Sequence, residues 1–346
     1  MFQNNLLMGA ASISSDAAYT VDYSCRFDKS TPAYLSYTPG SAGDRRQITV
    51  SYWQKRGNIG GQQVAFQSGS VYWQFGNSSV EKFQINTDGS GEMLSPRLFR
   101  DPNAWYHFVI SFDTEQDVPS NRIRVWVNGI PITDWSTLTG PTKDTDLSIT
   151  NTVAQVWGVY GTSTYPMDGY LSQVCMIDGL ALNATSFGEF DDNGVWRPID
   201  ITGLTFGTTG YLLDFADSSD LGNDVSGNNN DFTSSGLAAA DQMIDTPTNN
   251  FCTMSPLDKN TNITLSDGNL TSTGSGGWHH GRGTLFASSG KWYYEWTPDS
   301  GSYALAGWMT NIGNDHNEEE GDPETAQYRG IGAGLGVTLG NQTAIT

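Results

Sequence analysis

Apolar and polar residues alternate in short segments along most of the chain, and clusters of Gly, Pro, Asn and Asp separate these segments. In residues 48–53, the apolar Ile48, Val50 and Tyr52 alternate with polar neighbours, which predicts a strand with one buried face. Strands are also predicted at three segments with the same short apolar pattern: 63–66, 71–75 and 81–85. This spacing is typical of a sandwich and predicts an all-β protein.

The clearest strand signals lie in the middle of the chain. Residues 105–112 and 122–127 are two strand-like runs joined by a polar loop, so we expect an antiparallel pair. Asn128-Gly129 follows directly, and this dipeptide favours a tight turn because both residues tolerate positive φ. Another strand is predicted at 170–177.

The character of the sequence changes near residue 200, and the segment 217–231 is dense in Asp, Asn, Ser and Gly. We place the boundary between two β regions there. The predicted division is an N-terminal arm at 1–22, a first sandwich at 23–200, a connecting region at 201–255 and a second β region at 256–346.

The last two of these regions carry further signals. Residues 237–244 predict one short helix, ended by Thr246-Pro247, and the aromatic run 291–296 predicts a strand. The second β region holds roughly 90 residues, which is small for a sandwich, so we expect it to be incomplete at Thr346.

Composition agrees with a β-rich protein. The 346 residues include 40 Gly and 12% aromatic residues, but only 16% are charged, whereas helix-rich proteins use more Glu, Lys and Arg. The net charge of -20 would repel nucleic acid and anionic lipid surfaces. We therefore expect no nucleic-acid binding. Since no apolar run approaches about 20 residues, we also expect no membrane insertion.

The cysteines and the N-terminus indicate the cellular compartment in which the protein is made. Cys25, Cys175 and Cys252 are too few and too widely spaced for a disulfide scaffold or a zinc ribbon, so we expect buried free thiols. The first twelve residues contain no Lys or Arg and only a short apolar stretch, unlike a secretory signal. We therefore expect synthesis in a cytoplasm.

Three motifs occur in an order that resembles a known family. They are the run 101–107 containing Trp-Tyr-His, the run 122–129 ending in Val-Asn-Gly, and Asp168-Gly169-Tyr170 leading into a strand. Together they resemble the laminin-G-like, concanavalin A-like proteins over residues 20–190. The resemblance implies a jelly-roll sandwich.

A wider resemblance covers nearly the whole chain. The segments 2–5, 100–107, 194–198 and 245–251 are similar to laminin-G-like appendage proteins of marine tailed bacteriophages, which are tail-fibre-like. This similarity implies a structural protein of the virion, made in the host cytoplasm and displayed on the particle surface.

The second β region resembles another fold. Residues 290–295, followed by Gly307-Trp308, are similar to the opening of a SPRY-type sandwich. The expected fold class is therefore an all-β concanavalin A-like jelly-roll sandwich followed by an incomplete SPRY-like β-sandwich.

One acidic segment is a candidate metal site. Carboxylate and amide oxygens on Gly-bearing loops can wrap Ca²⁺, although this segment lacks the Glu at position 12 of an EF-hand loop. A turn-forming linker without metal is the competing interpretation. The candidate calcium ligands are Asp217, Asp220, Asp224, Asn228 and Asp231.

Catalytic patterns are poorly represented. Glu320, Asp322 and Glu324 have the spacing of a glycoside hydrolase strand, but Pro323 and the hydrophilic flank favour a solvated loop. His107 lies in an apolar strand and is expected to be structural. There is no nucleophile elbow or phosphate loop, so we assign no catalytic residue and predict a protein that is not an enzyme.

Aromatic residues in loop-like stretches are candidates for sugar contact. Pyranose rings stack on aromatic side chains while polar neighbours bind hydroxyl groups. The candidates are Trp135, Tyr165 and Trp278, whereas the tryptophans in strand patterns are expected to pack inside: Trp53, Trp105, Trp126, Trp292 and Trp296.

The leading hypothesis is a tail-fibre or appendage protein that contacts host surface glycans or other virion subunits. We expect a homo-oligomer, a trimer or larger, because weak sugar affinity becomes useful through multivalency. The alternatives are a capsid-bound decoration or head-fibre protein and, less favoured, a polysaccharide depolymerase.

Overall fold

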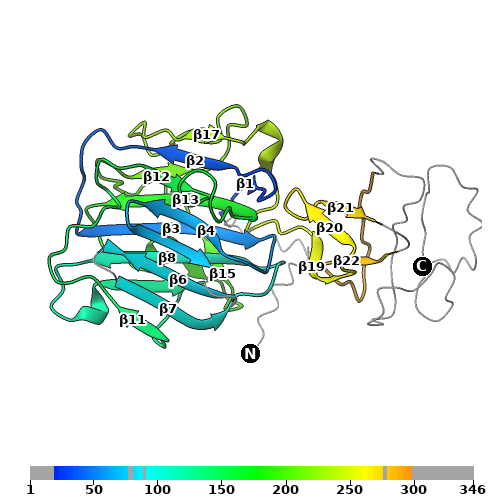
Figure 1. The fold of residues 1–346 in the computed structure, drawn as a ribbon, viewed down its shortest axis with the longest axis horizontal. Helices are drawn as coiled ribbons and strands as arrows, with labels where there is room; N and C mark the ends of the chain where they lie inside the picture. The colour runs from blue at the N-terminus through cyan, green and yellow to red at the C-terminus, as the bar shows by residue number, and fades with distance from the viewer. Residues whose placement is uncertain (1–18, 77–80, 89–90, 276–278, 298–346) are drawn as a thin grey trace, which may run out of the picture.

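The computed structural model describes residues 19–76, 81–88, 91–275 and 279–297. Two large antiparallel sheets, A and B, stack face to face in it (Figure 1). In spatial order, sheet A contains β10 (Ile130–Pro131), β9 (Ile123–Val127), β8 (Trp105–Asp113), β3 (Gln47–Arg56), β13 (Gly169–Asp178), β1 (Ser24–Phe27) and β18 (Gln242–Met243), with β16 (Tyr211–Leu213) also on β13.

Sheet B also has eight strands. In spatial order they are β11 (Thr137–Thr139), β7 (Gly91–Leu98), β6 (Lys82–Thr87), β5 (Val71–Phe75), β4 (Gln63–Ser68), β12 (Gln155–Trp157), β2 (Tyr34–Tyr37) and β17 (Thr233–Ser235). The expected all-β sandwich is confirmed, as are the β8–β9 pair and the Asn128-Gly129 turn that joins β9 to β10.

Short elements complete the described chain. The 3₁₀ helices are η3 (Pro119–Asn121), η4 (Ala184–Ser186) and η5 (Ala239–Asp241). Three small two-stranded sheets pair β14 (Gly188–Phe190) with β15 (Trp196–Pro198), β19 (Met254–Lys259) with β22 (Gly281–Gly283), and β20 (Ile263–Ser266) with β21 (Thr271–Gly274).

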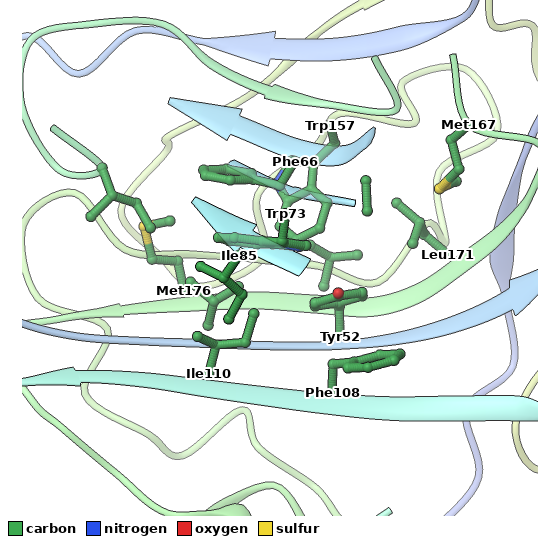
Figure 2. Close-up of a cluster of buried hydrophobic side chains, with 14 of the residues drawn as sticks. Tyr52, Phe66, Trp73, Ile85, Phe108, Ile110, Trp157, Met167, Leu171 and Met176 are labelled. Carbon is green, nitrogen blue, oxygen red and sulfur yellow. The ribbon is translucent and has the colours of Figure 1, made fainter. Parts of the chain in front are cut away.

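The core between the sheets is rich in aromatic rings (Figure 2). Phe66 stacks on Trp73 with ring centroids 4.3 Å apart, and Tyr52 from sheet A packs edge-on against Trp157 at 5.2 Å. Trp157 donates its indole N–H to the Tyr211 hydroxyl, 2.9 Å away. Alternate residues of each strand supply this core, because successive side chains in a strand point to opposite faces.

A third layer covers the outer face of sheet A. The sequence predicted that one face of β3 is exposed. This prediction is wrong, because Thr49 and Ser51 are buried together with the residues that face the core. The segment 184–206 packs over that face and contributes Phe187 and Trp196 to a second apolar cluster. Residues 48–53 contain no signal for this cover, which comes from a segment more than 130 positions later.

A bulge in β13 lets two different strands pair with the same edge. Gln173 has a φ of 45°, and the register with β3 shifts between Ser172 and Cys175. The bulge changes which positions face the core: Leu171 does so before it and Val174 after it. β1 pairs with the first half of β13 and β16 with the second half.

Residues after position 200 contribute strands to both sheets. β16 and β18 belong to sheet A, and β17 pairs with β2 in sheet B. The segment 211–243 is therefore built into the sandwich rather than lying between two domains. The helix predicted at 237–244 is reduced to the three-residue 3₁₀ helix η5, whose Asp241 forms an ion pair with Arg26 at 2.9 Å. The chain is then extended as β18, because Gln242 and Met243 pair with β1.

The second β region is described only in part. β19 to β22 lie at one end of the sandwich (Figure 1). Residues 291–297 form no strand, and Trp292 and Trp296 are exposed, so the expected strand and its buried tryptophans are not found there. Positions 307 and 308 lie outside the described residues, and the SPRY-like fold stays a prediction.

Three of the sequence motifs meet at the buried His107. Its ring stacks on Trp53 with centroids 4.5 Å apart, and Trp196 donates its indole N–H to Nδ1 at 2.9 Å. Because an indole N–H can only donate, Nδ1 is the acceptor, and Nε2 carries the proton that it donates to Ser51 Oγ at 2.8 Å. Burial lowers the pKa of His107 to about 3, so the neutral ring is the native form.

The Val-Asn-Gly motif supports the same cluster. The backbone N–H of His107 donates to Asn128 Oδ1 at 2.7 Å, and the Asn128 N–H donates to the His107 carbonyl. Gly129 has a φ of 75°, and a Cβ there would lie 2.3 Å from the Trp196 ring. The turn therefore needs glycine both for its backbone and for the indole that packs on it. His107 is structural, as expected.

The His107 cluster predicts a pH dependence of stability. The pKa of His107 is near 6.5 in the unfolded chain and about 3 in the folded chain, so the neutral ring stabilises the fold fully above pH 6.5 and less as the pH falls towards 3. Relative to pH 8, this residue should lower the free energy of unfolding by about 2 kcal/mol at pH 5. Urea unfolding at both pH values measures the loss.

The matched variant is His107→Gln, which removes the titrating ring. Burial raises the pKa of Asp168 to about 6, so that carboxyl has the opposite effect on stability in both proteins and cancels in the comparison. The wild type should lose about 2 kcal/mol more than the variant between pH 8 and pH 5. Equal losses would refute a neutral buried His107.

Candidate functional site

The candidate calcium segment is organised around one buried carboxylate. Asp224 Oδ1 accepts from the backbone N–H groups of Leu212 and Ser226, each at 2.9 Å. Oδ2 accepts from Ser226 Oγ and the Asn230 N–H, also at 2.9 Å. Protein donors therefore occupy both oxygens of Asp224 and tie the loop to β16.

The other candidate ligands also make local hydrogen bonds. Asp217 accepts from Ser219, Asp220 from the Gly222 N–H, and Asp231 from the Asp224 N–H. Asn228 donates to the carbonyls of Gly207 and Gly210. The described part of the chain contains no group of three or more His, Cys, Asp or Glu side chains that could hold a metal. Calcium binding in this loop stays a prediction.

The candidate sugar-binding aromatics are not brought together. Trp135 precedes β11 and packs, partly buried, against the main core. Tyr165 is 44% exposed, and its carbonyl accepts from the Val64 N–H of β4. β11 and β4 are four strands apart, or roughly 19 Å at about 4.8 Å per strand. Trp278 lies outside the described residues.

The outer surface of sheet B is lined by polar side chains in register. Gln67, Tyr72, Asn86 and Glu92 stand opposite one another on β4, β5, β6 and β7. Their neighbours in sequence, such as Trp73, point into the core. We call this surface the polar face; its members are Gln67, Tyr72, Gln74, Gln84, Asn86 and Glu92.

A relay of side-chain hydrogen bonds crosses the polar face. Gln62 Nε2 donates to Gln74 Oε1 at 2.5 Å, Gln74 Nε2 to Gln84 Oε1 at 2.8 Å, and Gln84 Nε2 to Glu92 Oε1 at 2.9 Å. Gln74 and Gln84 are buried, whereas the other members of the polar face are partly exposed. The buried amides therefore fix the side chains that a ligand would meet.

Tyrosines gather at one end of the polar face. The rings of Tyr72 and Tyr160 pack edge to face with centroids 5.3 Å apart. Burial raises the pKa of the Tyr72 hydroxyl, and the nearby Tyr160, Glu92 and Tyr165 raise it further. Tyr165, a residue that the sequence singled out, therefore lies beside the polar face.

Charge and hydrogen-bonding capacity define what this surface can bind. Among its six members Glu92 is the single charged side chain, and Lys82 stands on the same side of β6, two residues before Gln84. The Nδ2 of Asn86 is buried and has no hydrogen-bond partner within the described structure. The surface therefore offers amides, hydroxyls and aromatic rings, which suit a neutral polar ligand and oppose an anion.

The sequence by itself indicates some positions of the polar face. In 71–75 the polar Tyr72 and Gln74 alternate with apolar residues, and in 82–87 Gln84 and Asn86 do the same. Each alternation identifies outward positions. Which strands are neighbours, and in what register, follows only from the sheet.

Comparison with known proteins supports the fold. Residues 29–186 match the laminin-G-type family model described as the concanavalin A-like lectin/glucanases superfamily. No curated protein sequence matches the chain. The first region is therefore a laminin-G-like, concanavalin A-like jelly-roll sandwich.

Solved structures share parts of this architecture at low sequence identity. A putative carbohydrate-binding protein from Bacteroides ovatus is 13% identical with a TM-score of 0.44, and the match covers 65% of this chain and 60% of that one. The heptameric SAP-like pentraxin of Limulus polyphemus is 16% identical with a TM-score of 0.37, covering 48% and 80%. The mouse laminin α1 LG4-5 pair is 13% identical with a TM-score of 0.33, covering 58% and 49%.

Cys25 and Cys175 are buried free thiols as expected, but Cys252 is exposed. No helix within the described residues has the length and apolar character needed to cross a membrane.

The hydrogen bonds of Asp224 predict unequal roles for two aspartates. Asp224→Ala should lower the free energy of unfolding by about 3 kcal/mol, because buried donors lose their acceptor. Asp217→Ala should cost under about 1 kcal/mol, since that side chain is exposed and its hydrogen bonds are local. Urea unfolding compares them, and equal losses would contradict this assignment. Thermal melts with calcium and with a chelator test the calcium prediction.

Proposed function

We propose that this sandwich binds neutral glycans through the polar face of sheet B. The observation that carries the proposal is the register that aligns Gln67, Tyr72, Asn86 and Glu92 across four strands. Amide and carboxylate groups bind sugar hydroxyls, and tyrosine rings stack on the C–H faces of pyranoses. A row that crosses several strands suits an extended oligosaccharide better than a single sugar.

Charge supports a neutral ligand. The chain has a net charge of -20, and Glu92 is the charged member of the polar face, with Lys82 at the start of β6 beyond its edge. A phosphate, sulfate or sialic acid would be repelled there. The match of residues 29–186 to the concanavalin A-like lectin/glucanase model is compatible with sugar binding.

Binding without cleavage is the proposed activity. Retaining hydrolysis requires two carboxyl groups about 5 Å apart across the scissile bond. Glu92 has no second carboxylate beside it among the six members of the polar face. The Glu320 to Glu324 pattern lies outside the described residues.

The biological setting proposed for this binding is a phage virion. It rests on the similarity of segments such as 194–198 and 245–251 to phage appendage proteins. On a tail fibre, a trimer or larger oligomer would present several polar faces to one host surface, and multivalency would strengthen weak contacts. A capsid-bound decoration or head-fibre protein is the alternative location, with the same binding surface.

Substitutions on the polar face should weaken glycan binding. Tyr165→Ala removes an exposed ring beside the polar face and Asn86→Ala removes a partly exposed amide from it, so each should raise the Kd for neutral polysaccharides about tenfold, equivalent to about 1.4 kcal/mol. Titration calorimetry against neutral and sulfated polysaccharides measures both affinity and charge preference.

The matched control is Tyr293→Ala, because Tyr293 is 80% exposed and lies outside sheet B. Its affinity should equal that of the wild type. A preference for sulfated polymers, or unchanged affinity in both polar-face variants, would reject this site. Newly formed reducing ends in the same samples would instead identify a depolymerase.

The proposed setting predicts where the protein lies on a particle. Antibody labelling or cryo-electron microscopy of virions that carry this chain should place it on the tail or its fibres. Density on the capsid shell would replace the tail assignment with a decoration role, and absence from purified virions would refute the setting altogether.

A further inference from the structure

A fully buried lysine lies at the junction of three segments. Lys55, near the end of β3, has no exposed surface, and its Nζ lies 2.7 Å from Asp245 Oδ2. The same Nζ lies 2.8 Å from Asn250 Oδ1 and 2.7 Å from the Phe251 carbonyl. An amine, a side-chain amide and a carboxylate thus lie in contact at one largely buried site.

The surroundings fix each of these groups. Trp105 donates its indole N–H to Asp245 Oδ1 at 2.9 Å, and Asn250 Nδ2 donates to the Asn103 carbonyl at 2.8 Å. The rings of Trp105 and Tyr170, both almost fully buried, line the site. Asp245 is 6% exposed, so water has little access to its carboxylate.

We propose that Lys55 and Asn250 form an intramolecular isopeptide bond, with Asp245 transferring the protons. The Lys55 Nζ attacks the Asn250 side-chain carbonyl carbon and the new C–N bond replaces the bond to Nδ2. One ammonia leaves. The reaction exchanges one amide for another, so it needs no oxidant, reductant or cofactor.

The arrangement provides the proton transfers that this reaction requires. Asp245 Oδ2 lies 2.7 Å from Nζ, where it accepts a proton and makes the amine nucleophilic. Nδ2 must gain one proton to leave as ammonia, and it turns away from the Asn103 carbonyl to do so. The hydrogen bond from Nζ to Asn250 Oδ1 holds amine and amide in contact, which removes most of the entropic cost of their encounter. Burial lowers the pKa of Lys55, although the nearby Asp245 opposes this effect, and the lowered pKa favours the uncharged amine.

The bond would join parts of the chain that are distant in sequence. Lys55 belongs to a central strand of sheet A, whereas Asn250 follows β18 and leads into β19. A covalent tie between them would hold the C-terminal strands on the sandwich under mechanical load. This inference is independent of the proposed glycan binding.

Mass spectrometry of the purified, denatured full chain tests the proposal directly. The intact mass should be lower than the sequence mass by one ammonia, after allowance for the initiator methionine. Proteolysis followed by tandem spectra should yield a branched peptide that joins Lys55 to Asn250. A full intact mass without the branched peptide would overturn the proposal.

Variants separate the cross-link from other reactions. Lys55→Arg and Asn250→Ala should restore the full mass, while the surface control Lys143→Arg should still lose ammonia. Asp245→Asn preserves the shape of the side chain and removes the base, so it should be folded by circular dichroism but unlinked. Loss of ammonia that persists in Lys55→Arg would reveal a cyclic imide instead, and loss of water would link Asp245; either result would refute the Asn250 bond.

Discussion

The indole of Trp196 packs against Gly129 and donates to His107, and this contact closes a third layer over sheet A. Without that layer, Trp53 and the outer residues of β8 and β13 would face water. The burial of both faces makes sheet A the centre of the protein. This contact also explains why the turn after β9 contains Gly129 and why the β14–β15 hairpin contains Trp196.

Burying sheet A on both sides places polar groups where water cannot reach them. An unpaired polar group in such a place costs several kcal/mol, roughly 2–7 depending on the reference state, so hydrogen-bond partners for these groups stabilise the fold. His107 is paired as a neutral ring, Lys55 contacts Asp245 and Asn250, and Asp224 gathers four donors. The partners come from segments after residue 190 in most cases. The segments after residue 190 therefore supply hydrogen-bond partners to buried groups of sheet A, such as His107 and Lys55.

Segment 184–206 covers the outer face of sheet A but not the outer face of sheet B. The inner face of sheet B meets the aromatic core, and its outer face carries amides, Glu92 and tyrosines in register. The buried Gln74 and Gln84 brace this surface through a relay of hydrogen bonds. A polar surface beside the exposed Tyr165 is what the proposed glycan binding requires.

The sequence by itself determined the all-β class, the strands β4, β5, β8, β9 and β13, and the Asn128-Gly129 turn, because these depend on alternation and local backbone preference. It also indicated the structural role of His107, whereas sugar contact by Tyr165 stays a prediction. Only the tertiary structure decided that β3 is buried on both faces, that residues 211–243 belong to the sheets, and that Tyr72, Asn86 and Glu92 form one row. The physical reason is that strand neighbours and covering layers are long-range contacts, and local alternation specifies only which way a side chain points.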